Sequence, residues 1–258
     1  MIHQVLSYIQ WLPKTFYLHG IHSPFAYTLT KECLRNKRSS KHTTEIHDYR
    51  KRLFSSKKTI EVTDFGAGSR VFKSNTRKVS AIAKNAGATK KRMLLLQRLV
   101  AYLNPEQLLE FGTSLGMATF AMSKGSQSTK ITSLEGCPAT TAVAREILEH
   151  FKVQNVELIE GRFRESLKEI KSPTIDMVYF DGNHSKEATL SYVKTMLPTV
   201  KNETVWIFDD IHWSLEMTQA WEKIKVMPEV SVTIDCYWLG FVFFRKEQVK
   251  EDFYVRLG

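Results

Sequence analysis

The sequence predicts an α/β fold in which helices cover both faces of a mostly parallel, doubly wound sheet. From about residue 106, short apolar segments alternate with helix-forming segments, which is the pattern of successive strand–helix units. Two of these segments, "MVYF" and "VWIF", have no alternating polar positions, as expected of strands buried on both faces. Two strand candidates then follow each other directly, which predicts an antiparallel last strand.

Five strand–helix units are expected in chain order, followed by the closing pair of strands. The strands are expected at residues 107–111, 130–135, 155–160, 175–181 and 204–210. The helices that follow them are expected at 115–124, 139–151, 162–170, 185–197 and 214–225. The closing strands are expected at 229–235 and 239–245, so that residues 101–258 form one sheet domain.

Residues 1–100 differ, and we expect them to form a basic, mainly helical extension that caps the sheet domain. Helices are expected at 2–12, 24–35 and 79–103, with the basic linker "NKRSSKHTTE" and a single strand candidate, "TIEVTDF", between the last two. The extension holds 20 Lys and Arg against 5 Asp and Glu, whereas residues 101–258 hold 17 against 22. Such a basic part either meets an anionic substrate, a nucleic acid or a membrane surface, or is simply a solvated face.

The composition is that of a soluble globular protein, with 43% hydrophobic and 25% charged residues. No apolar run approaches the ~18–20 residues that span a bilayer, and the N-terminus lacks the basic and apolar segments of a signal peptide. Cys33, Cys137 and Cys236 are odd in number and far apart, without the spacing of zinc ligands. We therefore expect a cytoplasmic protein with reduced thiols.

Two glycine-containing turns compete for the role of ligand site, "VTDFGAGS" at residues 62–69 and "LLEFGTSLG" at 108–116. A nucleotide-binding turn needs a strand before it, a helix after it and a second strand that ends in an acid for the ribose. The second turn has all three, because the next strand ends in Glu135, 25 residues after Glu110. No second strand is expected after the first turn, so we assign it to the cap, together with Asp64 and Arg70.

The spacing of Gly112 and Gly116, without a glycine between them, departs from the dinucleotide pattern G-x-G-x-x-G. The turn "EFGTSLG" resembles that of the class I S-adenosylmethionine-dependent methyltransferases, in the variant of the small-molecule O-methyltransferases. The segment "DGNHSKEATLSY…IFDDIHWSLEM" looks like an uncharacterised bacterial branch with an N-terminal extension. The resemblance implies a Rossmann-like sheet and S-adenosylmethionine as cofactor. The cofactor-binding residues it implies are Glu110, Gly112, Thr113, Ser114, Gly116, Glu135, Gly136, Arg162, Phe163 and Asp181.

Within this resemblance, Glu110 would lie near the amino-acid end of the cofactor, and Glu135 would bind the ribose hydroxyls. The turn at residues 160–163 would lie beside the adenine. In the metal-dependent O-methyltransferases an acid ends the fourth strand, and an acid–amide pair follows the fifth. Asp181, Asp209 and Asp210 match those places, except that the family has Asn at the last one. A divalent cation such as Mg²⁺ therefore stays open.

Two polar clusters follow the fourth and fifth strands, where a doubly wound sheet binds its ligands. Asp181 and His184 follow the fourth strand, and Asp209, Asp210 and His212 end the fifth. In the structural interpretation, Asp181 and Asp210 cap the next helices. In the functional one, the catalytic residues are His184, Asp181 and Asp209, and His184, or else His212, acts as a metal-free general base.

These features predict a methyltransferase that acts on a hydroxyl of a small molecule, which the basic extension suggests to be anionic. The competing interpretations are an RNA- or membrane-surface-binding protein that retains the cofactor fold, an RNA methyltransferase and, weakest, an NAD enzyme. As partners we expect a small-molecule substrate and neither a nucleic acid nor a membrane-spanning segment, and a homodimer stays open.

Overall fold

The computed structural model describes residues 2–36, 42–65, 72–170 and 174–257. The chain divides into two compact units. The terminal unit comprises Met1–Asn36 and Pro173–Gly258, and the central unit comprises Lys37–Ser172. The domain boundary expected near residue 100 stays a prediction.

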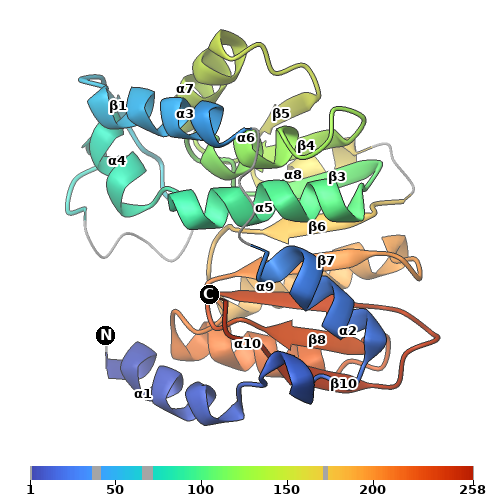
Figure 1. Cartoon of the computed structure of the whole chain (residues 1–258). Coiled ribbons are helices and arrows are strands. Elements are labelled where there is room, and N and C mark those ends of the chain that lie inside the picture. Colours follow the sequence, from blue (N-terminus) through green and yellow to red (C-terminus); the bar gives the residue numbers. More distant parts are fainter. Residues whose placement is uncertain (1, 37–41, 66–71, 171–173, 258) are drawn as a thin grey trace. The chain divides into compact units, whose positions relative to one another are not determined.

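The central unit holds three parallel strands in the order β3–β4–β5 (Figure 1). These strands are β3 (Gln107–Phe111), β4 (Lys130–Glu135) and β5 (Val156–Glu160), and each lies within one residue of its expected position. The helices that follow them are α6 (Met117–Ser123), α7 (Pro138–His150) and α8 (Phe163–Ser166), the last continued by a 3-10 turn at Leu167–Glu169. Because the strands are parallel, the loops after them emerge at one edge of the sheet.

The N-terminal part of the central unit differs from its prediction in three places. Its elements are α3 (Thr43–Ser55), β1 (Thr59–Glu61), β2 (Thr76–Lys78), α4 (Val79–Asn85) and α5 (Lys90–Leu103). The last residues of the predicted linker belong to a helix that was not predicted, α3, which packs against α5 and α6 (Figure 1). The single helix expected at 79–103 is two helices. A β-carbon at Gly87, between them, would lie 2.4 Å from the Met117 sulfur and 2.6 Å from the Ala83 carbonyl oxygen.

The expectation that no second strand follows the first glycine turn is also wrong. The strand β2 pairs antiparallel with β1, from Thr59 opposite Lys78 to Glu61 opposite Thr76. It ends in a lysine rather than an acid, so it does not supply the carboxylate that a ribose site needs. The turn itself, residues 66–69, and Arg70 lie outside the described residues.

The terminal unit holds five strands in the order β10–β8–β9–β7–β6 (Figure 1). Their bounds are β6 (Met177–Phe180), β7 (Val205–Asp209), β8 (Val232–Asp235), β9 (Leu239–Phe243) and β10 (Glu251–Tyr254). The strands β6 and β7 are parallel, and β9 is antiparallel to both β7 and β8. The mostly parallel fold with an antiparallel closing pair is therefore confirmed. The sequence did not predict β10, which runs parallel to β8.

The helices of the terminal unit come from both ends of the chain. They are α1 (Ile2–Trp11), α2 (Pro24–Leu29), α9 (Lys186–Met196) and α10 (Leu215–Lys225). A π-helical turn at Thr30–Leu34 extends α2, and 3-10 turns lie at Leu12–Lys14, Leu18–Gly20 and Leu197–Thr199. Every residue of β6 and β7 is buried, as predicted from their continuous apolar runs. Within the described ranges, no helix is long and apolar enough to cross a membrane.

Candidate active site

The turn after β3 is built around left-handed backbone at three positions. The φ angles are +97° at Gly112, +48° at Ser114 and +72° at Gly116. The amides of Gly112 and Thr113 donate hydrogen bonds to the Leu134 carbonyl oxygen, at 2.9 and 3.2 Å. A β-carbon at Gly116 would lie 2.6 Å from the Tyr49 hydroxyl oxygen. The backbone conformation and the lack of space both require glycine at position 116.

The Glu135 carboxylate joins this turn to the start of α7. Its Oε2 accepts a hydrogen bond of 2.6 Å from the Ser114 amide, and its Oε1 accepts one of 2.9 Å from the Cys137 amide. Burial raises the pKa of Glu135, an effect that these backbone donors oppose. The acid predicted to bind a ribose therefore also fixes the shape of the glycine turn.

Glu110 lies beneath the turn and is fully buried. Its Oε2 accepts hydrogen bonds from the hydroxyls of Thr119 and Ser133, each at 2.5 Å, and the Ser133 hydroxyl also contacts that of Thr113. The Glu110 carboxylate thus anchors the end of β3, the first turn of α6 and the middle of β4.

Phe65, Gly136 and Arg162 meet beside this turn. A β-carbon at Gly136 would lie 2.7 Å from the Phe65 ring, and the Arg162 guanidinium lies 5.3 Å from the centre of that ring. Phe163 packs edge-on against Phe111, with ring centres 5.5 Å apart. Every cofactor residue predicted in the central unit therefore lies in, or directly beside, the loops after β3, β4 and β5.

Sequence reasoning missed two aromatic residues of the central unit that support these loops. Tyr49 from α3 is buried beneath the turn and stacks on Phe120, with ring centres 4.3 Å apart. Phe65 follows β1 and reaches Gly136. The signal for Tyr49 was its place in a helical stripe with Ile46 and Leu53, both also buried. No local pattern marked the partner of Phe65.

In the terminal unit, the Tyr179 hydroxyl lies between two of the predicted catalytic acids. Its oxygen is 3.3 Å from Oδ2 of Asp181 and 3.0 Å from Oδ2 of Asp209. A tyrosine hydroxyl has a single proton, so it donates to one carboxylate at a time. The parallel register of β6 and β7 sets Phe180 opposite Phe208, which brings the two strand ends together. Tyr179 was read only as part of an apolar strand.

His184 forms an ion pair with Asp181. Its Nε2 is 3.5 Å from Oδ1 of Asp181, and both side chains are about one quarter exposed (25% each). Burial alone would lower the pKa of the His184 imidazole. The contact with Asp181 and the charges of the neighbouring carboxylates outweigh burial and raise this pKa to about 9. His184 is therefore an imidazolium at neutral pH, not the half-titrated group expected from an unperturbed histidine.

Both acid-bearing loops contain non-glycine residues with left-handed backbone. The φ angles are +64° at Asn183, +32° at His184 and +52° at Asp210. Such conformations cost about 1–3 kcal/mol each and occur preferentially at functional sites. The capping interpretation of Asp181 and Asp210 is wrong, because Ser185 and Ser214 cap α9 and α10.

His212, the alternative base, belongs to a buried network. Its Nδ1 is 3.3 Å from the Thr218 hydroxyl oxygen and its Nε2 is 2.9 Å from Oδ2 of Asp235. The Trp221 indole also donates to Asp235, at 3.1 Å. Both ring nitrogens of His212 are engaged within the protein, which fits a structural role.

Among the described residues, no group of three or more His, Cys, Asp or Glu side chains could hold a metal ion. The divalent cation stays a sequence-based hypothesis.

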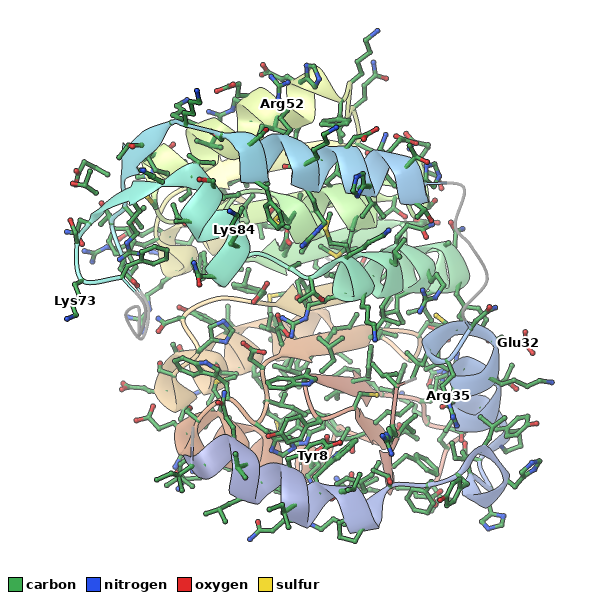
Figure 2. The ribbon with its side chains drawn as sticks, turned by 60° about the vertical axis from the view of Figure 1, so that its left-hand side comes forward. Tyr8, Glu32, Arg35, Arg52, Lys73 and Lys84 are labelled. Atoms are coloured by element: carbon green, nitrogen blue, oxygen red, sulfur yellow. The ribbon has the colours of Figure 1, made fainter. Side chains whose placement is uncertain are left out.

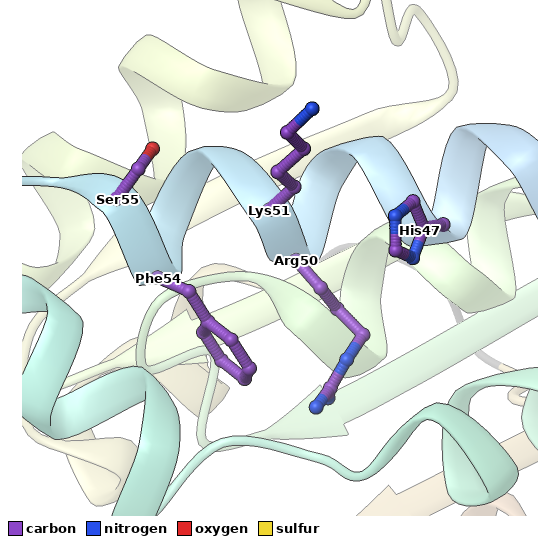
Figure 3. Close-up of a pocket in the computed structure, with 5 residues that line it drawn as sticks. All are labelled: His47, Arg50, Lys51, Phe54 and Ser55. Carbon is purple, nitrogen blue, oxygen red and sulfur yellow. The ribbon is translucent and has the colours of Figure 1, made fainter.

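A separate shallow pocket of about 330 Å³ lies along α3 (Figure 3). Its described lining residues all come from α3, and none is a predicted site residue: His47, Arg50, Lys51, Phe54 and Ser55. Figure 3 shows Arg50 and Phe54 on the same side of the helix and Lys51 on the other. Arg50 donates to the Ala88 carbonyl and lies over the Phe54 ring, so it already has partners within the protein.

Solved structures that resemble the chain include several methyltransferases. The methyltransferase PaMTH1 of Podospora anserina, solved with S-adenosylhomocysteine, is 15% identical, with a TM-score of 0.61 over 88% of this chain and 97% of that one. The Bacillus cereus O-methyltransferase, also bound to S-adenosylhomocysteine, is 17% identical, with a TM-score of 0.56 over 83% and 94%. The O-methyltransferase TomG of Streptomyces achromogenes is 16% identical, with a TM-score of 0.53 over 61% and 81%.

The fold is therefore that of the class I methyltransferases. Residues 109–211 match the family described as a methyltransferase domain. No curated protein matches the chain by sequence. The chain thus has the fold of the S-adenosylmethionine-dependent methyltransferases and contains a segment that matches a methyltransferase domain, as predicted from "EFGTSLG" and the order of the strands.

Proposed function

We propose that the protein transfers the methyl group of S-adenosylmethionine to a hydroxyl oxygen of a small molecule. The observation that carries this proposal is the extent of the methyltransferase-domain match. Residues 109–211 run from the strand that precedes the glycine turn to the loop after β7. They include every residue predicted to bind the cofactor and the predicted catalytic residues His184, Asp181 and Asp209, whereas the alternative base His212 lies one residue beyond them.

The central unit would hold the cofactor through its three loops. The backbone of residues 112–116 would wrap the amino-acid part, since its left-handed turn exposes the main chain for close approach. Glu135 would accept hydrogen bonds from the ribose hydroxyls in addition to those it receives from the turn. When bound, S-adenosylmethionine supplies a methyl group on a positively charged sulfur. An oxygen nucleophile attacks the methyl carbon in line with the carbon–sulfur bond, and the sulfur is the leaving group.

The terminal unit would remove the proton of the acceptor hydroxyl. We assign this step to the neutral form of His184, whose Nε2 would take the proton while the oxygen–carbon bond forms and the carbon–sulfur bond breaks. Asp181 would stabilise the resulting imidazolium, as its ion pair does in the resting protein. Asp209 would help to position the Tyr179 hydroxyl, which lies within hydrogen-bond distance of both carboxylates and donates its proton to one of them at a time.

The acceptor class follows in part from the local charge. Asp181, Asp209 and Asp210 outnumber the His184 imidazolium, so the acceptor group beside them is best a neutral hydroxyl. The basic residues of the N-terminal part favour an acceptor that is anionic elsewhere. Figure 2 shows several of these basic side chains, among them Lys73, directed into solvent. The cytoplasmic location and the homodimer stay predictions from the sequence.

Calorimetry of the full chain with S-adenosylhomocysteine, NAD and ATP in parallel tests the cofactor class. We expect tight binding of S-adenosylhomocysteine alone, followed by methyl transfer in a screen of hydroxylated metabolites. Binding of NAD or ATP in its place would contradict the proposal. Salt-dependent retention on RNA or anionic vesicles without methyl transfer would instead support the binding-protein interpretation.

A further inference from the structure

Phe65 is held against the cofactor loops by the segment that follows β1. The Thr63 amide donates a hydrogen bond to the Cys137 sulfur at 3.4 Å, and the Cys137 thiol is 3.9 Å from the Glu61 carbonyl oxygen. These contacts tie residues 61–63 to the start of α7, one residue beyond Gly136. The Phe65 ring then lies against Gly136, where any larger residue would collide with it.

Phe65 remains 45% exposed in spite of these contacts. Its charged neighbour is Arg162, whose guanidinium lies 5.3 Å from the ring centre, within the range of a cation–π interaction. Arg162 itself is exposed and is the N-cap residue of α8, directly after Gly161. Two flat groups, one aromatic and one cationic, are therefore presented together beside the residue that follows Glu135.

We propose that Phe65 and Arg162 form a stacking platform for the adenine of the cofactor. The inference rests on the proposed function and adds a residue of the N-terminal segment to the binding site. The purine is bonded directly to the ribose, so a ribose on Glu135 brings its base close to Gly136. A purine stacks well on an aromatic ring and on a guanidinium plane.

A purely structural role for Phe65 predicts a different response to substitution. If the ring served only to pack residues 61–65 onto α7, its removal would lower stability and leave ligand affinity unchanged. A stacking platform makes affinity depend on the flat ring. Tyrosine then preserves binding, whereas leucine, which is apolar but not flat, does not.

Because of the same contact, a substitution at Gly136 is a second way to test the platform. An alanine there would place its β-carbon 2.7 Å from the ring and displace Phe65 without removing any group that could contact the ligand. Gly136→Ala should therefore weaken binding of adenosine-containing ligands in the same direction as Phe65→Ala.

The test is calorimetry of the whole 258-residue chain with S-adenosylhomocysteine and with methylthioadenosine, which lacks the amino-acid part. We expect Phe65→Ala and Phe65→Leu to weaken both ligands by about tenfold, the usual scale for loss of a base–aromatic stack. Phe65→Tyr should bind like the wild type. Tyr102→Ala, at an equally exposed aromatic residue at the end of α5, is the matched control and should also bind like the wild type.

Unchanged affinity of Phe65→Leu for both ligands, with the wild type binding well, would overturn the platform and leave the proposed function intact. Failure of the wild type to bind S-adenosylhomocysteine would overturn both. A cycle with Arg162→Ala gives a further check. If the two side chains act as one platform, their losses are not additive, and strictly additive losses would contradict a shared platform. Melting curves confirm that each variant is folded.

Discussion

The Tyr49 hydroxyl donates a hydrogen bond of 2.8 Å to the carbonyl oxygen of Leu115. Leu115 lies inside the glycine turn, whereas Tyr49 comes from α3, 66 residues earlier in the chain. Both residues are buried, so the bond joins the N-terminal part of the central unit to the floor of the candidate cofactor site.

Tyr49→Phe should therefore affect both stability and cofactor binding. It leaves the Leu115 carbonyl without this donor, and an unsatisfied buried acceptor costs about 1–3 kcal/mol. We expect a lower free energy of unfolding and a weaker affinity for S-adenosylhomocysteine, by up to about tenfold. Denaturant unfolding and calorimetry measure the two effects. Tyr102→Phe is the control, and equal behaviour of the two variants would refute a role for the Tyr49 hydroxyl.

Gly116→Ala should abolish most cofactor binding, because the left-handed backbone and the Tyr49 hydroxyl both oppose a β-carbon there. The left-handed backbone conformation alone costs a residue with a β-carbon about 1–2 kcal/mol. Since the closest contact is the hydroxyl oxygen, the double variant with Tyr49→Phe should recover part of the affinity for S-adenosylhomocysteine. No recovery in calorimetry would show that the collision with Tyr49 is not what limits the turn.

The fold was predictable from the sequence where the signal is local. The strands β3 and β4 match their predicted bounds to the residue, because a buried parallel strand is a short apolar run between polar residues. The helix α3 was missed because only Ile46, Tyr49 and Leu53 of its mostly polar sequence are buried. Each short strand of the β1–β2 pair has three residues, and their pairing depends on contacts distant in sequence.

The candidate site was predictable only as a set of residue types at strand ends. The positions of Asp181 and Asp209 follow from the strand order, but the bridging role of Tyr179 depends on the register of β6 and β7. The charge of His184 could not be read from the sequence, because neighbouring carboxylates set its pKa. The place of Phe65 beside the site likewise could not be predicted, since its partners Gly136 and Arg162 follow strands much later in the chain.

The pH dependence of turnover should report the raised pKa of His184. If its neutral form is the base, kcat/KM increases about tenfold per pH unit from pH 7 and levels off above about 9. Asp181→Asn removes the negative charge that raises the pKa of His184. The rise in kcat/KM should therefore move to lower pH, even though the maximum rate falls. A profile that is flat between pH 6 and 10 would exclude His184 as the base.

Stability should depend on pH through the same group, with a sign fixed by linkage. The pKa of His184 is about 9 in the folded protein and about 6.5 in an unfolded chain. Below pH 6.5 both states are protonated, and the ion pair with Asp181 contributes fully. As the pH rises from 6.5 to 9, the unfolded state releases its proton first, so this contribution declines and is lost above pH 9.

Thermal melting between pH 6 and pH 9.5 tests this expectation. Over that range the melting temperature of the wild type should fall further than that of His184→Gln, which keeps a polar side chain but does not titrate. His150→Gln, at an exposed histidine at the end of α7, should follow the wild-type curve. If His184→Gln and the wild type lose stability in parallel, the Asp181–His184 pair does not carry the charge that the geometry gives it.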